Sequence, residues 1–113
     1  MEARLASSVL VHGLLRLAAQ GGGFGAVLAR GDDNAGAVTV ILTERGERRM
    51  ILERAVQGDG RYGWQEVGNR AAGNDEEFQK FLERRQRFDP DLWLIELDVA
   101  SAERFADEMA ALS

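Results

Sequence analysis

The sequence predicts one α+β domain over residues 1–113, with the order α-β-β-β-β-α-β-α and helices laid over a mainly antiparallel sheet. Three observations support this fold class. Apolar residues recur at helical spacing near residues 4–20, 75–88 and 102–112. Short β-branched and aromatic runs, separated by turns rich in glycine and aspartate, lie between these helices. A chain of 113 residues suits a single core, and no internal repeat or low-complexity tract marks a second domain.

The first helix is indicated by polar residues that recur every four positions from Arg4 to Gln20. Gly21-Gly22-Gly23 should end it, because glycine readily adopts the left-handed conformation that follows a helix. Strands are then expected at residues 24–30, 37–43, 49–55 and 61–67. Short strands joined by Gly/Asp turns are typical of an antiparallel meander, so we expect these four to pair in sequence order.

A second helix is expected to begin after Asn74, which can cap it, with Glu77 completing a box-like pair. Pro90 should stop this helix, because the residue before a proline avoids helical geometry. Residues 92–99 are apolar on both faces at their start, which predicts an interior strand. Ser101 should then cap the last helix. The expected apolar face of the second helix is formed by Phe78, Phe81, Leu82 and Phe88.

Composition excludes several classes of function. The net charge of −5 argues against binding nucleic acid through bulk charge. The absence of cysteine excludes disulfides, thiolate metal sites and a cysteine nucleophile. His12 is the only histidine, so a multi-histidine metal site is excluded, and we expect His12 to be solvated. No run approaches the roughly 20 apolar residues that span a bilayer. We therefore expect a cytoplasmic protein with no cofactor, no nucleic-acid partner and no membrane partner.

The run Gly21-x-Gly23-x-x-Ala26 fits the loose form of a phosphate-binding glycine loop. A dinucleotide fingerprint, however, needs its glycines between a strand and the helix whose N-terminus holds the phosphate. Here the glycines follow a helix and precede a strand. The order of elements therefore predicts a structural turn in place of a nucleotide site.

Four carboxylates near the second helix end provide an alternative function. Asp89, Asp91, Glu96 and Asp98 could bind Mg²⁺, which would make the protein a small magnesium-dependent hydrolase or a nucleotide-binding protein. Glu96 and Asp98 should face the same side of a strand, about 7 Å apart. In the competing interpretation, Asp89 and Asp91 shape the turn around Pro90, with Asp89 accepting backbone hydrogen bonds. We favour this second interpretation, in which the carboxylates are structural.

The leading interpretation is a small non-enzymatic module that binds a protein partner or a copy of itself. No catalytic constellation is evident in the sequence. Tyr62 and Trp64 share a short strand expected at a sheet edge, where unpaired backbone groups and aromatics favour self-association, so we expect a homodimer. Arginines at the end of the second helix could bind an anionic group. The candidate interaction surface comprises Tyr62, Trp64, Arg84, Arg87, Asp89 and Asp91.

Two stretches of the sequence form recognisable motifs. The first is a G-D-x-x-A-G-A-V turn, and the second is the segment R-F-D-P-D-L-W-x-x-E. Together they resemble a small alphaproteobacterial family, a domain of unknown function. The resemblance covers nearly the whole chain and implies a bacterial cytosolic location, but it implies no activity, substrate or catalytic residue. The positions that carry it are Gly31, Asp32, Ala35, Gly36, Arg87, Phe88, Asp89, Pro90, Asp91, Leu92, Trp93 and Glu96.

Overall fold

A computed structural model describes residues 5–68 and 73–113 of the chain. The helices and strands follow one another in the predicted order, and their positions agree closely with the sequence pattern. The elements are α1 (Ser7–Gln20), β1 (Phe24–Ala29), β2 (Val38–Glu44), β3 (Glu47–Val56), β4 (Tyr62–Glu66), α2 (Asp75–Phe88), β5 (Trp93–Asp98) and α3 (Ala102–Met109).

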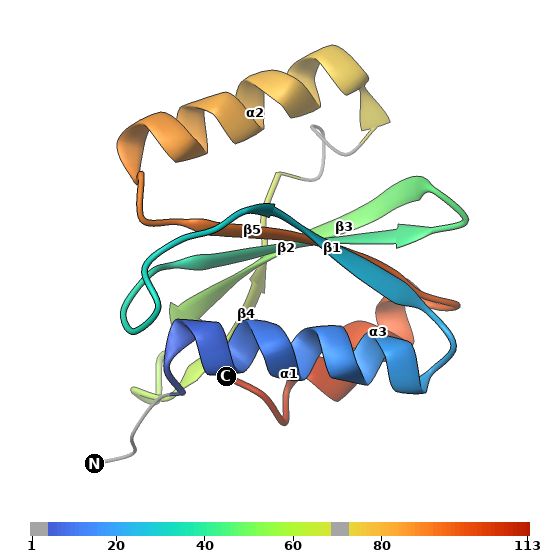
Figure 1. Cartoon of the computed structure of the whole chain (residues 1–113), viewed down its shortest axis with the longest axis horizontal. Coiled ribbons are helices and arrows are strands. Elements are labelled where there is room, and N and C mark those ends of the chain that lie inside the picture. The colour runs from blue at the N-terminus through green and yellow to red at the C-terminus, as the bar shows by residue number, and fades with distance from the viewer. Residues whose placement is uncertain (1–4, 69–72) are drawn as a thin grey trace.

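The five strands form one sheet between two helical layers (Figure 1), with α2 on one face and α1 and α3 on the other. The strand order is β1-β5-β2-β3-β4, and every neighbouring pair is antiparallel except β2 and β5. The predicted meander is therefore correct for β2–β3–β4 and wrong for β1, which pairs with β5. The connection between β1 and β2 crosses the start of β5, where the Asp32 amide donates to the Asp91 carbonyl over 3.0 Å.

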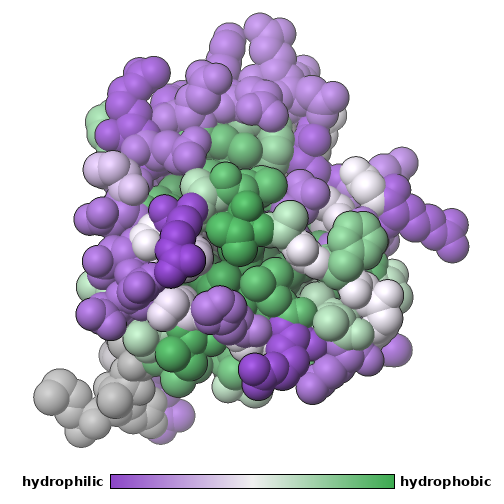
Figure 2. All heavy atoms as spheres, viewed as in Figure 1, coloured by the Kyte–Doolittle hydropathy of each residue, from purple (hydrophilic) through white to green (hydrophobic). Residues whose placement is uncertain are grey.

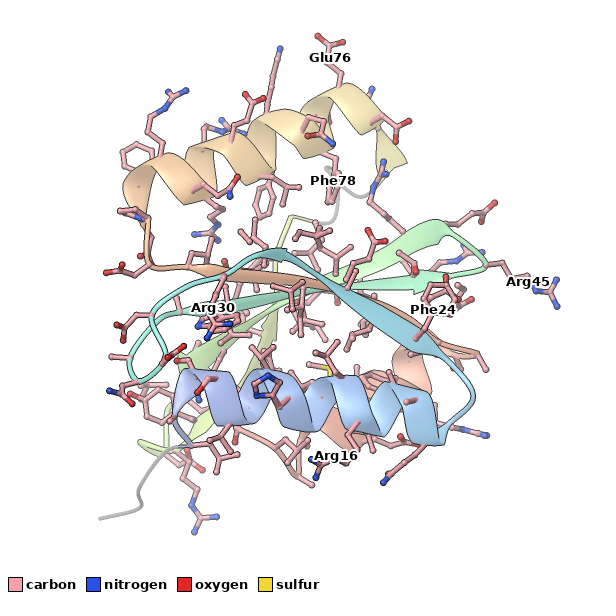
Figure 3. All side chains as sticks on the ribbon, in the orientation of Figure 1. Arg16, Phe24, Arg30, Arg45, Glu76 and Phe78 are labelled. Atoms are coloured by element: carbon pink, nitrogen blue, oxygen red, sulfur yellow. The ribbon has the colours of Figure 1, made fainter. Side chains whose placement is uncertain are left out.

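Each face of the sheet has its own apolar core, as the alternation along the strands requires. The larger cluster packs beneath α1 and α3, and its strand residues include Val38, Val40 and Leu42. The smaller cluster lies beneath α2 and contains Ile41, which points to the opposite face. Phe78 extends from α2 toward the sheet (Figure 3) and belongs to this second cluster. The residues of β2 are therefore divided between the two cores in the alternating order of a strand.

The helix ends confirm the predicted capping. After α1, Gly22 adopts a φ of +86°, and the Gly23 amide donates to the Ala18 carbonyl over 2.9 Å. The Asn74 side chain accepts from the Glu77 amide over 3.1 Å at the start of α2. Ser101 accepts from the amide of the third residue of α3 over 3.3 Å. Such side-chain caps satisfy amides that have no partner inside the helix.

One predicted core residue is on the surface. Phe88 was expected on the apolar face of α2, but 84% of it is exposed. Phe88 is the last helical residue, and the contacts of this half of α2 with the sheet are made about two turns earlier, by Phe81 and Leu82. Among the described residues, no helix combines the length and apolar character needed to cross a membrane.

Candidate functional site

A cleft of about 390 Å³ opens between the C-terminal half of α2 and the adjoining ends of β2 and β3. We call it the α2 cleft. Its volume lies within the range of about 300–1,000 Å³ that is usual for ligand pockets. The cleft is lined by Ala37, Val38, Glu53, Arg54, Phe81, Arg84, Arg85, Phe88, Asp89 and Leu92.

The walls of the α2 cleft are apolar at their base and aromatic at the mouth. Val38 and Leu92 are buried, with exposed fractions of 1% and 4%. Phe81 is partly buried against the smaller core cluster. Phe88 exposes most of its ring beside them. An apolar group entering from solvent would therefore meet side chains that are already held in place by the fold.

A partly buried polar network fixes one wall of the cleft. The hydroxyl of Thr39, which is completely buried, donates to one carboxylate oxygen of Glu53 over 2.9 Å. The other oxygen of Glu53 accepts from Arg85 over 2.5 Å. The guanidinium of Arg85 also lies 5.3 Å from the ring centre of Phe81, within the range of a cation–π contact. Glu53 therefore offsets the charge of Arg85 and holds both its side chain and that of Phe81 in position.

The other two arginines of the cleft differ in their surroundings. Arg54 donates to the Leu5 carbonyl over 2.9 Å and to Ser7 over 3.1 Å, so its guanidinium is directed toward the start of α1. Arg84 is exposed, and within residues 5–68 and 73–113 it forms no salt bridge. Arg84 is therefore the cation that the cleft offers to a ligand.

The floor of the cleft ends at the corner between α2 and β5. The Asp89 carboxylate accepts from the Asp91 amide over 3.1 Å, and the Leu92 amide donates to the Asp89 carbonyl over 3.2 Å. This confirms the predicted structural role of Asp89 in the turn around Pro90. Trp93 follows, is only 2% exposed and packs in the larger core cluster, so it anchors the start of β5.

The two segments that carry the family resemblance meet at this corner. The indole of Trp93 donates to the Asp32 carbonyl over 2.7 Å. The Asp32 carboxylate in turn accepts from the amides of Asn34 and Ala35 over 3.1 and 2.8 Å, which shapes the loop from within. The Trp93 amide donates to the Ala37 carbonyl over 2.8 Å. These contacts position both sides of the α2 cleft relative to each other.

The four candidate carboxylates are not brought together. Asp89 and Asp91 precede β5, whereas Asp98 ends it, and a strand of six residues is about 20 Å long. No group of three or more histidine, aspartate or glutamate side chains in the described part of the chain is arranged to hold a metal ion. The magnesium-dependent alternative therefore lacks the cluster that it requires.

Asp98 instead holds the β2–β3 hairpin against β5. Its carboxylate accepts from the Thr43 hydroxyl over 2.7 Å and from the Gly46 amide over 2.9 Å. The two turn residues, Arg45 and Gly46, have φ values of 52° and 82°, as a tight hairpin turn requires. The Thr43 hydrogen bond, followed by the one from Gly46, lowers the pKa of Asp98 below its ordinary value of 3.8.

Replacing Thr43 with valine should raise the pKa of Asp98 toward 3.8, because it removes the largest cause of the shift. A carboxylate whose pKa is lowered in the folded state stabilises the fold at pH values above 3.8, the ordinary pKa. This stabilisation is lost as the pH falls through the lowered pKa of the folded state. The stability advantage of the wild type over Thr43→Val should therefore shrink in acid. A carboxyl NMR titration together with unfolding at several pH values measures both effects. An unchanged pKa in the variant would contradict this assignment.

A larger hollow of about 670 Å³ lies at the opposite end of β5, beside the glycine loop and the β2–β3 hairpin. Three of its charged groups contact one another: Arg49 bridges to Glu44 over 3.5 Å and to Glu47 over 3.0 Å. Glu44 also accepts from the Ala102 amide over 2.8 Å, near the start of α3. Arg45 extends away from the hairpin tip (Figure 3). We therefore regard the α2 cleft as the better candidate for a binding site.

The predicted interaction residues do not form one surface. Trp64 packs on the face of the sheet that α1 and α3 cover, and its indole donates to the carbonyls of Met109 and Leu112 over 3.1 and 2.7 Å. Tyr62 shares the edge strand β4 with Trp64. Arg84 and Asp89 line the α2 cleft on the opposite face, and Arg87 and Asp91 are exposed outside its lining.

Sequence reasoning missed Phe81, Leu92 and Val38 as cleft residues, because each has the pattern of an ordinary core residue. Phe88 was wrongly placed on the buried face of α2 because helical spacing was the only guide to its position. It lies seven residues after Phe81, so helical spacing alone places both side chains on one face. Its position at the last helical residue, directly before the Asp-Pro corner, was the signal that could have marked it as exposed.

The fold and the cleft define the class of this protein: it is a small α+β domain with helices on both sides of a mixed five-stranded sheet. The domain has an apolar cleft, and its described residues form no metal-binding cluster. The chain belongs to the DUF1491 family, described as a protein of unknown function, whose model matches residues 5–107. No curated protein matches the chain.

Solved structures of this family are similar over nearly the whole chain. A crystal structure of a DUF1491 protein from Caulobacter crescentus CB15 is 32% identical, covers 89% of this chain and 94% of its own, and has a TM-score of 0.75. The solution structure of protein Atu0922 from A. tumefaciens is 30% identical, with coverages of 91% and 92% and a TM-score of 0.70. An NMR structure from Caulobacter crescentus CB15 is 30% identical, with coverages of 92% and 94% and a TM-score of 0.73. The predicted membership of an alphaproteobacterial family of unknown function is confirmed.

Proposed function

We propose that the chain is a non-enzymatic protein-binding module whose α2 cleft receives an apolar side chain flanked by an acidic residue of a partner protein. The observation that carries this proposal is the exposure of Phe88, 84% of which is accessible beside an apolar cleft. Aromatic residues and arginine are enriched among the residues that dominate binding energy in protein interfaces.

The apolar part of the proposal rests on the arrangement of Phe81, Phe88 and Leu92. Leu92 is anchored by the core, and Phe81 is held by the Arg85 contact, so two of the three are fixed before a ligand arrives. Preorganised side chains lower the entropic cost of binding. A partner's leucine or phenylalanine side chain would cover the exposed Phe88 ring and remove apolar area from water.

The acidic part of the proposal rests on Arg84. Glu53 already pairs with Arg85, whereas Arg84 stands at the cleft without a salt bridge among the described residues. Arginine binds a carboxylate through two parallel hydrogen bonds, which adds directional specificity. A carboxylate next to the apolar anchor would therefore complete the contact.

The surroundings of the cleft support binding in place of catalysis. Its two carboxylates already accept hydrogen bonds within the chain, Glu53 from Arg85 and Thr39, and Asp89 from the Asp91 amide.

The composition of the chain bears on its partners and location. A net charge of −5 disfavours nucleic acid as a partner, and we expect neither membrane nor cofactor. We place the module in the bacterial cytoplasm, with which a cysteine-free chain is compatible.

A random linear-peptide display library, selected on the wild type and counter-selected on Phe88→Ala, tests the proposal without assuming a partner. We expect enrichment of peptides in which a leucine or phenylalanine lies beside aspartate or glutamate. Fluorescence polarisation with the enriched peptides should give a dissociation constant that rises about tenfold or more in Phe88→Ala. Arg84→Gln should weaken the same peptides and reduce the dependence of binding on salt.

The chain offers matched controls for both variants. Phe24→Ala removes another exposed phenylalanine, 69% accessible, on β1, and Arg87→Gln removes an exposed arginine of α2 outside the cleft lining. Both should leave peptide binding unchanged. The proposal is wrong if no peptide is enriched over an empty support, or if the enriched peptides bind Phe88→Ala as well as they bind the wild type.

A further inference from the structure

Glu53 lies on the face of the sheet that α2 covers. It pairs with Thr39 across β3 and β2, and Ile51 pairs with Ile41 in the same register. Because side chains alternate along a strand, Glu53 faces the same side as Ile51, which belongs to the smaller core cluster. Glu53 therefore follows directly on the apolar core beneath α2, and it lines the α2 cleft where this core ends.

A carboxylate at this position adds little to packing. The Glu53 side chain is only 21% exposed, and the side chain of its partner Arg85 is 41% exposed. Taking a carboxylate out of water costs free energy, and replacing a buried ion pair by apolar side chains of similar volume is often neutral or stabilising. The fold therefore gains little from a charge at residue 53, and the clearest effect of this charge is on the cleft.

The charge that the cleft offers to a ligand depends on Glu53. The charged residues among those that line the cleft are Glu53, Arg54, Arg84, Arg85 and Asp89. Arg54 is directed toward the start of α1, and Asp89 accepts a hydrogen bond within the corner. Arg84 and Arg85 remain, and Glu53 pairs with the second of them. Among the described residues, the cleft therefore presents one cation without an ion pair, and it would present two if Glu53 were neutral.

We propose that Glu53 determines the specificity of the α2 cleft, which accepts a partner segment with one acidic residue beside its apolar anchor and rejects a segment with two. This inference rests on the proposed function. A second acidic residue could reach Arg85 only by displacing Glu53. The displaced carboxylate would keep its hydrogen bond from Thr39 but would lose its counter-charge in a partly buried position, which is unfavourable. If Glu53 kept Arg85, the second carboxylate would be repelled by a like charge.

The charges on α2 act in the same direction. Its first turn contains Asp75, Glu76 and Glu77, and Glu76 extends outward from this end of the helix (Figure 3). The surface of α2, at the top of the view in Figure 2, is largely hydrophilic. A segment with several acidic residues that ran along α2 would therefore be repelled at the helix start as well as at Glu53. A single carboxylate at Arg84 avoids both.

Parallel selection of peptides tests the proposal. The same random peptide library is selected on the wild type and on Glu53→Gln, which keeps the size of the side chain and an oxygen that can accept from Thr39. Peptides with one acidic residue beside a leucine or phenylalanine should be enriched on both proteins. Peptides with two should be enriched on Glu53→Gln only. This result is a gain of binding, which the loss of a merely structural contact would not produce.

Matched pairs of peptides give the size of the effect. The two members of a pair share their apolar anchor and first acidic residue, and one member has an added aspartate. By fluorescence polarisation, the added aspartate should give no gain in affinity for the wild type. It should strengthen binding to Glu53→Gln about tenfold, the effect of one hydrogen bond between charged groups. The double variant Glu53→Gln/Arg85→Gln should lose this gain, because Arg85 is the cation on which it depends.

Glu83→Gln is the control for net charge, because it removes one exposed carboxylate of α2 outside the cleft lining. It should bind both peptides as the wild type does, and unfolding curves establish that every variant is folded. An equal gain in the wild type, in Glu83→Gln or in the double variant overturns the proposal, as does the absence of a gain in Glu53→Gln. When peptides are enriched on the wild type, such a failure leaves the proposed function standing. When no peptide is enriched on either protein, both are wrong.

Discussion

Replacing Trp93 with alanine should lower the free energy of unfolding by about 3–5 kcal/mol, the usual cost of a large-to-small change in a core. Trp93 is 2% exposed and packs in the larger core cluster at the start of β5. Its indole donates to the Asp32 carbonyl over 2.7 Å, and the Arg30 guanidinium lies 5.4 Å from its ring centre. The substitution would therefore leave a cavity and also release the loop that joins β1 to β2.

Urea unfolding followed by circular dichroism measures this effect and avoids dependence on tryptophan fluorescence. Trp93→Phe is the informative control, because it keeps an aromatic ring and removes the indole hydrogen bond. We expect this variant to lose less stability than the alanine variant, about 1–2 kcal/mol. A loss below about 1 kcal/mol for Trp93→Ala would show that the ring is not a core anchor.

Gly31→Ala should lower the free energy of unfolding by about 3 kcal/mol, at the upper end of the usual cost of overpacking. A Cβ atom at Gly31 would lie 2.1 Å from the Asp91 carbonyl oxygen and 2.7 Å from the Trp93 ring. The closest atom belongs to the backbone of the corner, which cannot rotate away as a flexible side chain could. Relief requires the loop and the start of β5 to separate, which breaks the Asp32–Asp91 hydrogen bond.

Gly58→Ala provides the matched control for this prediction. Nothing lies within 4 Å of a Cβ atom built at Gly58, and its φ is not in the left-handed region. The same substitution there should be neutral, or should stabilise by up to about 1 kcal/mol through the unfolded chain. Equal unfolding midpoints for Gly31→Ala and Gly58→Ala would rule out close backbone packing as the reason for glycine at residue 31.

Part of the candidate site could be predicted from the sequence. Arg84 and Asp89 were identified as interaction residues, and both line the α2 cleft. The corner at Pro90 was also predicted, because an Asp-Pro pair after a helix restricts the backbone locally. The opposite wall could not be predicted, since Val38 and Glu53 lie on strands that only tertiary packing brings beneath α2. Phe88 was misplaced because helical periodicity cannot reveal where the sheet stops beneath a helix.

The sequence by itself determined the order, type and ends of the elements. Those features depend on contacts between near neighbours, such as the Asn74 cap, the glycine turn after α1 and the alternation of Val38 and Ile41. Only the tertiary structure decided that β5 lies between β1 and β2. Backbone hydrogen bonds are the same for every strand, so a sequence pattern does not specify which strands pair. The position of β5 is decided by packing between distant segments, above all by the contacts of Trp93 and the Asp91 carbonyl with the loop after β1. These contacts are possible because the loop has glycine at residues 31 and 36, where a Cβ atom would collide with the Asp91 carbonyl oxygen.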